Sequence, residues 1–241
     1  QRDRFDLLDV TYLNCCYMSP QMKAATDAGQ EAVTRKARPW EVAPVDFFTE
    51  SEALRGAYAE LSGAAAADVA LIPSASYGLA LAAKNLPLSP GQQVLVLANQ
   101  FPSNVYVWQE RCREVGAELR FLEANPGQTL SECVLDAIGA NTGIVALPNV
   151  HWSDGRWLDL VAIAARCREV GAALVLDLTQ SLGAAPFSVQ EVQPDFMISA
   201  GYKWLCGPYT LGMLYAAPQR QGGSPLEHNW NARKQSEDFR N

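Results

Sequence analysis

Histidine is scarce in this sequence of 241 residues, and its cysteines are scattered. It holds two histidines and six cysteines, and no two cysteines form a Cys-x-x-Cys pair. Structural zinc sites draw on such pairs and on closely spaced histidines, so we expect no metal site. Reduced thiols in a cytoplasmic protein are the simplest interpretation of the cysteines.

Long apolar runs are also lacking. Gly, Pro, Asn or Asp interrupts the most apolar windows within about 18 residues, which is too short for a helix that crosses a bilayer. The charged first six residues lack the apolar core of a signal peptide. We therefore expect neither a membrane span nor a membrane partner.

Excess positive charge and nucleotide-binding motifs are absent as well. Nineteen basic residues against 26 acidic ones give a formal net charge of −7, which disfavours nucleic acid as the main partner. Neither a Gly-x-Gly-x-x-Gly motif nor a P-loop is present, so a nucleotide-binding domain has little support. The net charge does not argue for or against a small-molecule ligand.

Short apolar runs predict a mainly parallel sheet. Several runs are almost continuously apolar, as in strands covered on both faces, and helical patterns separate many of them. The predicted strands lie near Val69–Ile72, Val94–Leu97, Glu118–Leu122, Ile144–Leu147, Ala173–Asp177, Asp195–Ser199 and Leu211–Ala216. The expected fold class is α/β, a seven-stranded sheet with helices on both faces.

Helix boundaries carry their own signals. The segment Thr49-Glu50-Ser51-Glu52 has capping-box spacing and predicts a helix start. Glycines at 63, 116 and 171 are expected to end three helices.

Composition divides the chain into three regions. Residues 1–45 are expected to form an extended N-terminal arm with one helix near Met22–Arg35. Residues 46–216 hold the predicted strands and form the expected ligand-binding domain. Residues 217–241 are polar and show no second core, so we interpret them as the start of a connection.

Lys203 and Asp177 suggest a specific chemistry. Asp177 ends one predicted strand and Lys203 closely follows the next, and ligands of open α/β sheets bind beyond such strand ends. Taken singly, Asp177 fits a turn residue and Lys203 a surface lysine. Together they favour pyridoxal phosphate (PLP), which needs a Schiff-base lysine and a carboxylate that keeps its ring nitrogen protonated.

Two further segments agree with this cofactor. Ser74, Ala75 and Ser76 lead from a predicted strand into a helix, where free amides and the helix dipole attract phosphate, although a serine there can simply cap the helix. Phe101 follows the Val94–Leu97 run and can stack on a flat ring. A core phenylalanine is the alternative.

The sequence resembles the class V aminotransferase family of fold-type I PLP-dependent enzymes from about Tyr12 to Tyr215. The most specific blocks are DLTQSLG at residues 177–183 and GYKWLCGP at residues 201–208. The family includes cysteine desulfurases, selenocysteine lyases, kynureninases and several aminotransferases. The resemblance implies the large domain of that fold, PLP as cofactor, an amino-acid substrate and a homodimer.

The resemblance also implies residue roles at the cofactor's reactive end. Lys203 matches the Schiff-base lysine and Asp177 matches the partner of the pyridine nitrogen. Gln180 matches the residue that faces the cofactor's phenolic oxygen.

Five more positions match cofactor contacts of the family. Ala75 and Ser76 match the phosphate loop, and Tyr202 matches a phosphate-contacting position. Phe101 stands where desulfurases usually carry a stacking histidine and kynureninases a phenylalanine. Trp152 takes the place of an asparagine that lies near the cofactor in desulfurases, whereas kynureninases tend to have an aromatic residue there.

Three features depart from the family pattern or stay open. Gln180 is typical of desulfurases, since kynureninases carry histidine there. His151 either approaches the substrate or makes a structural hydrogen bond. The stretch 228–230 either reaches cofactor phosphate across a dimer interface, as in some relatives, or forms an exposed loop.

Relatives generally continue into a small C-terminal domain that supplies an arginine for the substrate carboxylate. We expect this domain to be absent or truncated in the present chain, and none of the six cysteines matches the sulfur-accepting cysteine of desulfurases.

The leading hypothesis is a PLP-dependent enzyme that acts on an amino acid through a Schiff base on Lys203, in a lyase or desulfurase-type reaction. Transamination or epimerisation is one alternative. A non-catalytic scaffold that keeps the fold is another.

Overall fold

Seven strands form one sheet in the computed structural model, which describes residues 1–230, 233, 235, 236 and 238. The strand order is β1 (Val69–Ile72), β7 (Gly212–Ala216), β6 (Phe196–Ala200), β5 (Ala173–Asp177), β4 (Thr142–Pro148), β2 (Gln93–Leu97) and β3 (Glu118–Leu122). Strand β7 is antiparallel to both its neighbours, and the other adjacent pairs are parallel. The predicted, mainly parallel sheet is confirmed.

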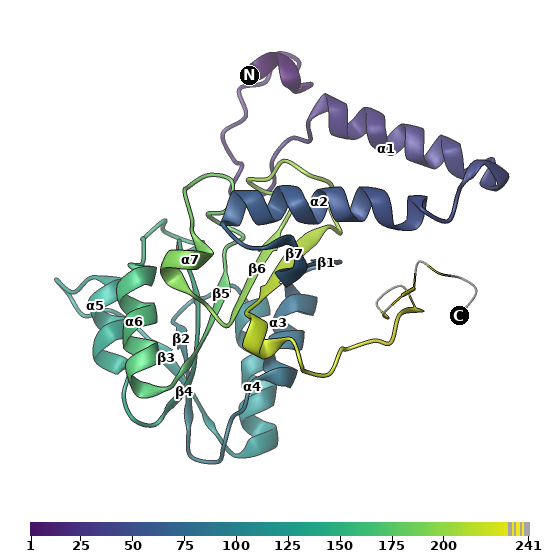
Figure 1. Ribbon diagram of the computed structural model, residues 1–241. Coiled ribbons are helices and arrows are strands. Elements are labelled where there is room, and N and C mark those ends of the chain that lie inside the picture. Colours follow the sequence, from purple (N-terminus) through teal and green to yellow (C-terminus); the bar gives the residue numbers. More distant parts are fainter. Residues whose placement is uncertain (231–232, 234, 237, 239–241) are drawn as a thin grey trace.

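Helices cover both faces of the sheet (Figure 1). Helices α3 (Ala75–Asn85) and α4 (Ser103–Val115) bury their apolar residues in one core layer. The opposite layer receives α2 (Asp46–Ser62), α5 (Leu130–Ala137), α6 (Leu160–Val170) and α7 (Val189–Val192). Strands β4, β5 and β6 are almost wholly buried between the two layers, which explains their continuous apolar runs.

Glycines end three helices as predicted. Gly63, Gly116 and Gly171 follow α2, α4 and α6 with φ values of 71°, 74° and 76°. This left-handed conformation costs glycine little because it has no Cβ atom.

The predicted helix start at Thr49 is wrong. Helix α2 begins at Asp46, so Thr49 lies inside its first turn. The Thr49 hydroxyl donates to the Val45 carbonyl at 3.1 Å instead of capping the helix. The Asp46 carboxylate accepts from the Ala43 amide at 2.8 Å and so orders the turn that precedes the helix.

Helix α1 (Lys23–Lys36) lies outside both layers and buries none of its residues. In Figure 1 it lies above α2, and an ion pair between Arg35 and Glu50 links the two helices. Among the helices that the structure describes, none combines the length and the apolar character needed to cross a bilayer.

The chain that follows β7 runs back over α3. Lys84 donates to the Pro225 carbonyl at 2.9 Å, and Asn85 donates to the Ser224 carbonyl at 3.0 Å. Trp230 then meets the rings of Phe47 and Phe48 edge-on, each at 6.0 Å between centroids. Residues 231–232, 234, 237 and 239–241 of the predicted connection lie outside the described part.

Candidate active site

A cavity of about 290 Å³ opens at the carboxyl ends of β4, β5 and β6. Pro148, Asp177 and Ala200, which end these strands, all contribute to its wall. Every residue that the sequence singled out as a cofactor contact lines this cavity, namely Ala75, Ser76, Phe101, Trp152, Asp177, Gln180, Tyr202 and Lys203. The fold therefore brings together residues that are up to 128 positions apart in the chain.

Asp177 is a buried carboxylate at the wall of the cavity. It is 8% exposed, and its Oδ1 accepts a hydrogen bond from the Thr179 amide at 3.1 Å. Burial raises the pKa of Asp177 above its ordinary value, while the Thr179 hydrogen bonds and the positive charge of Lys203 act in the opposite direction. A cationic ligand atom would favour the ionised carboxylate further.

Lys203 lies in the turn after β6 and is 6% exposed. Burial lowers the pKa of its amine, and the negative charge of Asp177 partly offsets this effect. The Nζ atom lies 5.6 Å from the Phe101 ring centroid and 5.9 Å from that of Tyr202. The amine therefore lies in the cavity close to two aromatic rings.

Aromatic side chains form two walls around the amine. Phe101 and Trp152 meet edge-to-face, with centroids 5.6 Å apart and planes at 89°. The Tyr202 and Tyr209 rings pack together with centroids 4.4 Å apart and planes tilted by 34°. Phe101 is 40% exposed, so it is a cavity residue and the alternative of a core phenylalanine is excluded.

The start of α3 faces the same cavity. The Ser74 hydroxyl accepts from the Tyr77 amide at 3.1 Å, so the capping role does occur. The Ser76 hydroxyl donates to that of Ser103 at 2.9 Å. The amides of Ala75 and Ser76 belong to the first turn, whose N–H groups have no partner within the helix, and can bind an anion.

Gln180 makes contacts that the sequence did not predict. Its Nε2 donates to the Cys16 carbonyl at 3.1 Å, and its Oε1 accepts from Trp204 at 3.3 Å. The Ser19 amide donates to the Tyr202 carbonyl at 3.1 Å. The N-terminal arm therefore crosses the rim of the cavity beside Lys203, and no local pattern in residues 14–19 indicates this.

Several cavity residues were missed by sequence reasoning. They include Gln100, Ser103, Asn104, Thr179, Tyr209 and Thr210. Thr179 had a usable signal, since it follows the strand-end Asp177, and its hydroxyl accepts from the Ala200 amide at 3.0 Å. Tyr209 and Thr210 had none, because their place depends on the loop between β6 and β7.

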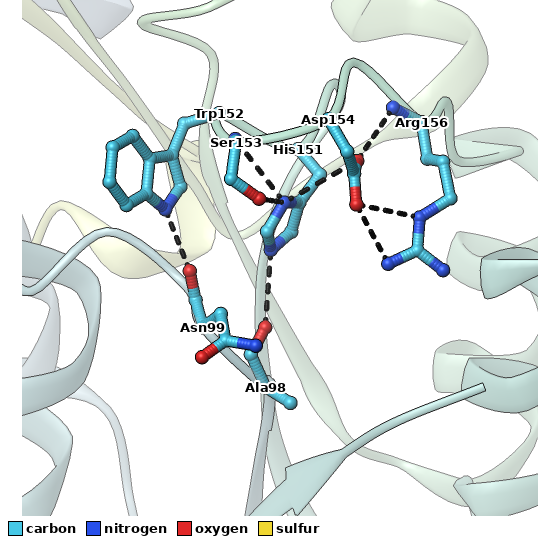
Figure 2. Close-up of polar contacts among 7 residues, drawn as sticks. All are labelled: Ala98, Asn99, His151, Trp152, Ser153, Asp154 and Arg156. Atoms are coloured by element: carbon cyan, nitrogen blue, oxygen red, sulfur yellow. Dashed lines mark hydrogen bonds and ion pairs between the residues drawn. The ribbon is translucent and has the colours of Figure 1, made fainter.

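His151 makes a structural hydrogen bond, which decides between the two alternatives left open by the sequence. Its ring is 2% exposed, and Nε2 lies 3.1 Å from the Ala98 carbonyl oxygen. Ser153 Oγ lies 2.9 Å from the other ring nitrogen. Figure 2 shows the ring turned toward Ala98.

The chemistry of the cavity fits PLP. The cofactor's aldehyde requires an amine, and its pyridine nitrogen requires a carboxylate. Its flat ring requires an aromatic face, and its phosphate requires a helix N-terminus. All four line one cavity. Among the described residues, no three His, Cys, Asp or Glu side chains gather as metal ligands would.

Comparison with known protein sequences gives a consistent result. The family model "Aminotransferase class-V" matches residues 29–228. A cysteine desulfurase of Klebsiella pneumoniae (strain 342) is 30% identical over 178 residues, which are 69% of this chain and 44% of that protein. A kynureninase of Deinococcus radiodurans is 35% identical over 176 residues, 71% of this chain and 41% of that protein. The chain thus spans less than half the length of these relatives.

Solved structures share the fold. The apo cysteine desulfurase of Thermococcus onnurineus NA1 superposes with a TM-score of 0.80 at 22% identity, over 90% of this chain and 56% of that one. The cystine C-S lyase C-DES, in complex with its reaction product cysteine persulfide, gives a TM-score of 0.81 at 21% identity, over 93% and 62%. The family match extends over most of the chain and includes every cavity residue named from the sequence. The chain therefore belongs to the class V aminotransferase family, whose cofactor is pyridoxal phosphate.

Proposed function

We propose that this chain binds PLP through Lys203 and acts on an amino-acid substrate in a lyase or desulfurase-type reaction. The observation that carries the proposal is the placement of Lys203 and Asp177, both buried, in one cavity with an aromatic wall. The similarity to a cysteine desulfurase and a kynureninase supports the reaction class.

Lys203 and Asp177 divide the proton chemistry. When bound, the cofactor supplies an aldehyde for an amine and a ring that withdraws electrons from the substrate. Burial lowers the pKa of Lys203, so a larger fraction of its amine is neutral and able to accept a proton from the substrate α-carbon. Asp177, oriented by the Thr179 amide, is assigned to hold the proton on the pyridine nitrogen.

The remaining cavity residues are assigned to binding. The amides of Ala75 and Ser76 and the Tyr202 side chain would hold the phosphate. Phe101 would stack on the ring, with Trp152 at its edge. Gln180 is assigned to the phenolic oxygen; because its amide now bonds Cys16 and Trp204, this role requires it to share or exchange a partner.

Replacement of the lysine tests cofactor binding. We expect Lys203→Ala to abolish the visible absorbance of bound PLP, and borohydride reduction of the wild type to leave a pyridoxyl group on Lys203 in peptide mass spectra. Lys23→Ala is the matched control, because Lys23 lies on α1, donates to the Asp3 carbonyl and is not among the residues that line the cavity. Wild-type protein without PLP absorbance after reconstitution would contradict the proposal.

An amino-acid panel with product identification by mass spectrometry separates the reaction classes. Sulfide or alanine release supports the lyase or desulfurase reaction. Keto acid with aminated cofactor identifies a transaminase, and racemised substrate an epimerase. PLP binding without turnover of any amino acid favours the scaffold.

The proposal includes the organisation of the whole molecule. Residues 46–216 are assigned as the PLP-binding domain, and residues 1–45 and 217–241 as the arm and the connection. The functional unit is proposed to be a homodimer. The cytoplasmic location stays a prediction from the sequence.

A further inference from the structure

Side chains bridge β2 and β4 where their backbone pairing has ended. The last register pair of the two strands is Leu95 with Val145, although both strands continue toward the cavity. Beyond that pair, the Gln100 side chain donates to the Ala146 carbonyl at 3.1 Å. The crevice in which an α/β sheet binds its ligand is formed at such strand ends, so these bridges set the shape of the cavity.

Figure 2 shows two further bridges across the same gap. His151 Nε2 lies 3.1 Å from the Ala98 carbonyl oxygen, and Trp152 Nε1 donates to the Asn99 carbonyl at 2.7 Å. Both side chains come from the turn after β4, and both carbonyls belong to loop 98–101 after β2. A carbonyl oxygen can only accept a hydrogen bond, so His151 carries its hydrogen on Nε2. The turn after β4 therefore supplies donors to two consecutive carbonyls of the loop.

The histidine cannot turn away from this contact. Its Nδ1 faces Ser153 Oγ at 2.9 Å and Asp154 Oδ1 at 3.6 Å, and the ring is buried. Asp154 is fixed in turn by the Arg156 side chain at 2.8 Å and by its amide at 3.0 Å. Contacts at both ring nitrogens therefore hold the histidine in place.

The loop held in this way carries Phe101. Asn99 has a φ of 55°, a left-handed conformation that asparagine adopts more readily than most residues with a side chain. The Phe101 ring meets Trp152 at 5.6 Å and lies 5.6 Å from the Lys203 amine. A shift of the loop would move this ring relative to the amine.

We propose that His151 and Trp152 are positioning residues that clamp loop 98–101 and thereby fix the Phe101 ring in the cavity. The consequence for PLP rests on the proposed function, because Phe101 is there assigned to stack on the cofactor. The proposal that the two residues fix loop 98–101 rests only on their hydrogen bonds to the Ala98 and Asn99 carbonyls.

Two replacements of His151 separate the contact with Ala98 from simple packing. The amide nitrogen of glutamine reaches the place of Nε2, whereas that of asparagine reaches only the place of Nδ1. We expect His151→Asn to leave the Ala98 carbonyl without its donor, to speed hydrogen exchange of amides 98–104 and to weaken PLP binding, each roughly tenfold. His151→Gln should stay within about twofold of wild type in both measurements.

A second pair of variants tests the tryptophan. Trp152→Phe keeps an aromatic ring beside Phe101 but loses the donor to Asn99, so we expect the same loosening of amides 98–104. Trp157→Phe is the matched control, because Trp157 lies in the same turn, is 53% exposed and does not line the cavity.

The outcomes are distinct. A lower melting temperature for His151→Asn with unchanged exchange and unchanged PLP affinity makes His151 a packing residue and overturns the proposal. If the wild type itself bound no PLP, the proposed function would be wrong. The hydrogen-exchange data alone would then test whether His151 clamps loop 98–101. Faster exchange in His151→Asn but not in His151→Gln then supports the clamp, and equal exchange refutes it.

Discussion

At the scale of single residues, the buried Asp177 carboxyl lowers the stability of the PLP-free fold, although the proposed function requires it. Burial raises its pKa above the ordinary 3.8, so the folded chain holds this proton more tightly than the unfolded chain does. The carboxyl therefore lowers the stability of the fold as the pH rises through its folded pKa. The protein keeps an ionisable group here at a cost to the stability of the PLP-free fold, which is typical of functional sites.

Asp177→Asn tests this conflict. Asparagine keeps an oxygen for the Thr179 amide but has no charge to bury, so we expect a higher melting temperature than wild type at pH 7 without PLP, and little difference at pH 3. PLP affinity should fall roughly tenfold or more, since one pKa unit of lost pairing corresponds to a factor of ten. Calorimetry at both pH values and a PLP titration measure these effects. A less stable variant at pH 7 would show that the carboxylate stabilises the PLP-free protein.

The sequence predicts the composition of the cavity better than the contacts within it. Strand ends in a parallel sheet share one edge, so Asp177 and Lys203 were expected to meet there, and both line the cavity. The partners of Gln180 were not predictable, because Cys16 lies 164 positions away in an arm without periodic pattern. Long-range contacts of irregular segments leave no signature in local sequence.

At the scale of elements, the segment after β5 and the lysine loop after β6 press together at Gly183. Its φ is 92°, and a Cβ atom there would lie 2.8 Å from the Trp204 carbonyl oxygen and 2.9 Å from Leu205 Cδ2. Only glycine allows this approach, and Trp204 is the neighbour of Lys203.

We expect Gly183→Ala to destabilise the protein by about 2 kcal/mol or more and to weaken PLP binding, because the clash displaces the loop of Lys203. Gly171→Ala is the control: its φ is 76°, but nothing lies within 4 Å of the added Cβ. Gly171→Ala should lower the free energy of unfolding by only about 1 kcal/mol, because alanine adopts the left-handed conformation less readily, and should leave PLP binding unchanged. Chemical denaturation and a PLP titration compare the two, and equal PLP affinity in all three proteins would contradict the argument.

Element boundaries show what local sequence can and cannot decide. Apolar runs predict all seven strands of the described sheet to within a few residues, and glycine marks helix ends because its conformational freedom is a property of one residue. The capping-box spacing at Thr49 predicted the start of α2 too late in the sequence. The helix begins at Asp46 instead, because the Asp46 carboxylate orders the turn that precedes it.

At the scale of the whole molecule, the homodimer is the part of the proposal that one chain cannot display. The chain has a mass of 26.2 kDa, and we expect light scattering to give twice this value for the purified protein. Helix α1 buries no residue within the chain, and Val33 and Trp40 are 76% and 79% exposed. A single-chain mass at all concentrations would contradict the dimer.

The antiparallel strand β7 has a consequence for the order of events during synthesis. It lies between β1 and β6, so β1, made early, has no hydrogen-bonding neighbour until residues 212–216 have left the ribosome. The turn at Ser74–Ser76 follows β1 directly, whereas Lys203 follows β6. Strand β1, which leads into the turn proposed to bind phosphate, therefore joins the sheet only once β7 is in place. Such non-local pairing folds slowly, so PLP capture should be a late event, after the nearly complete domain has emerged.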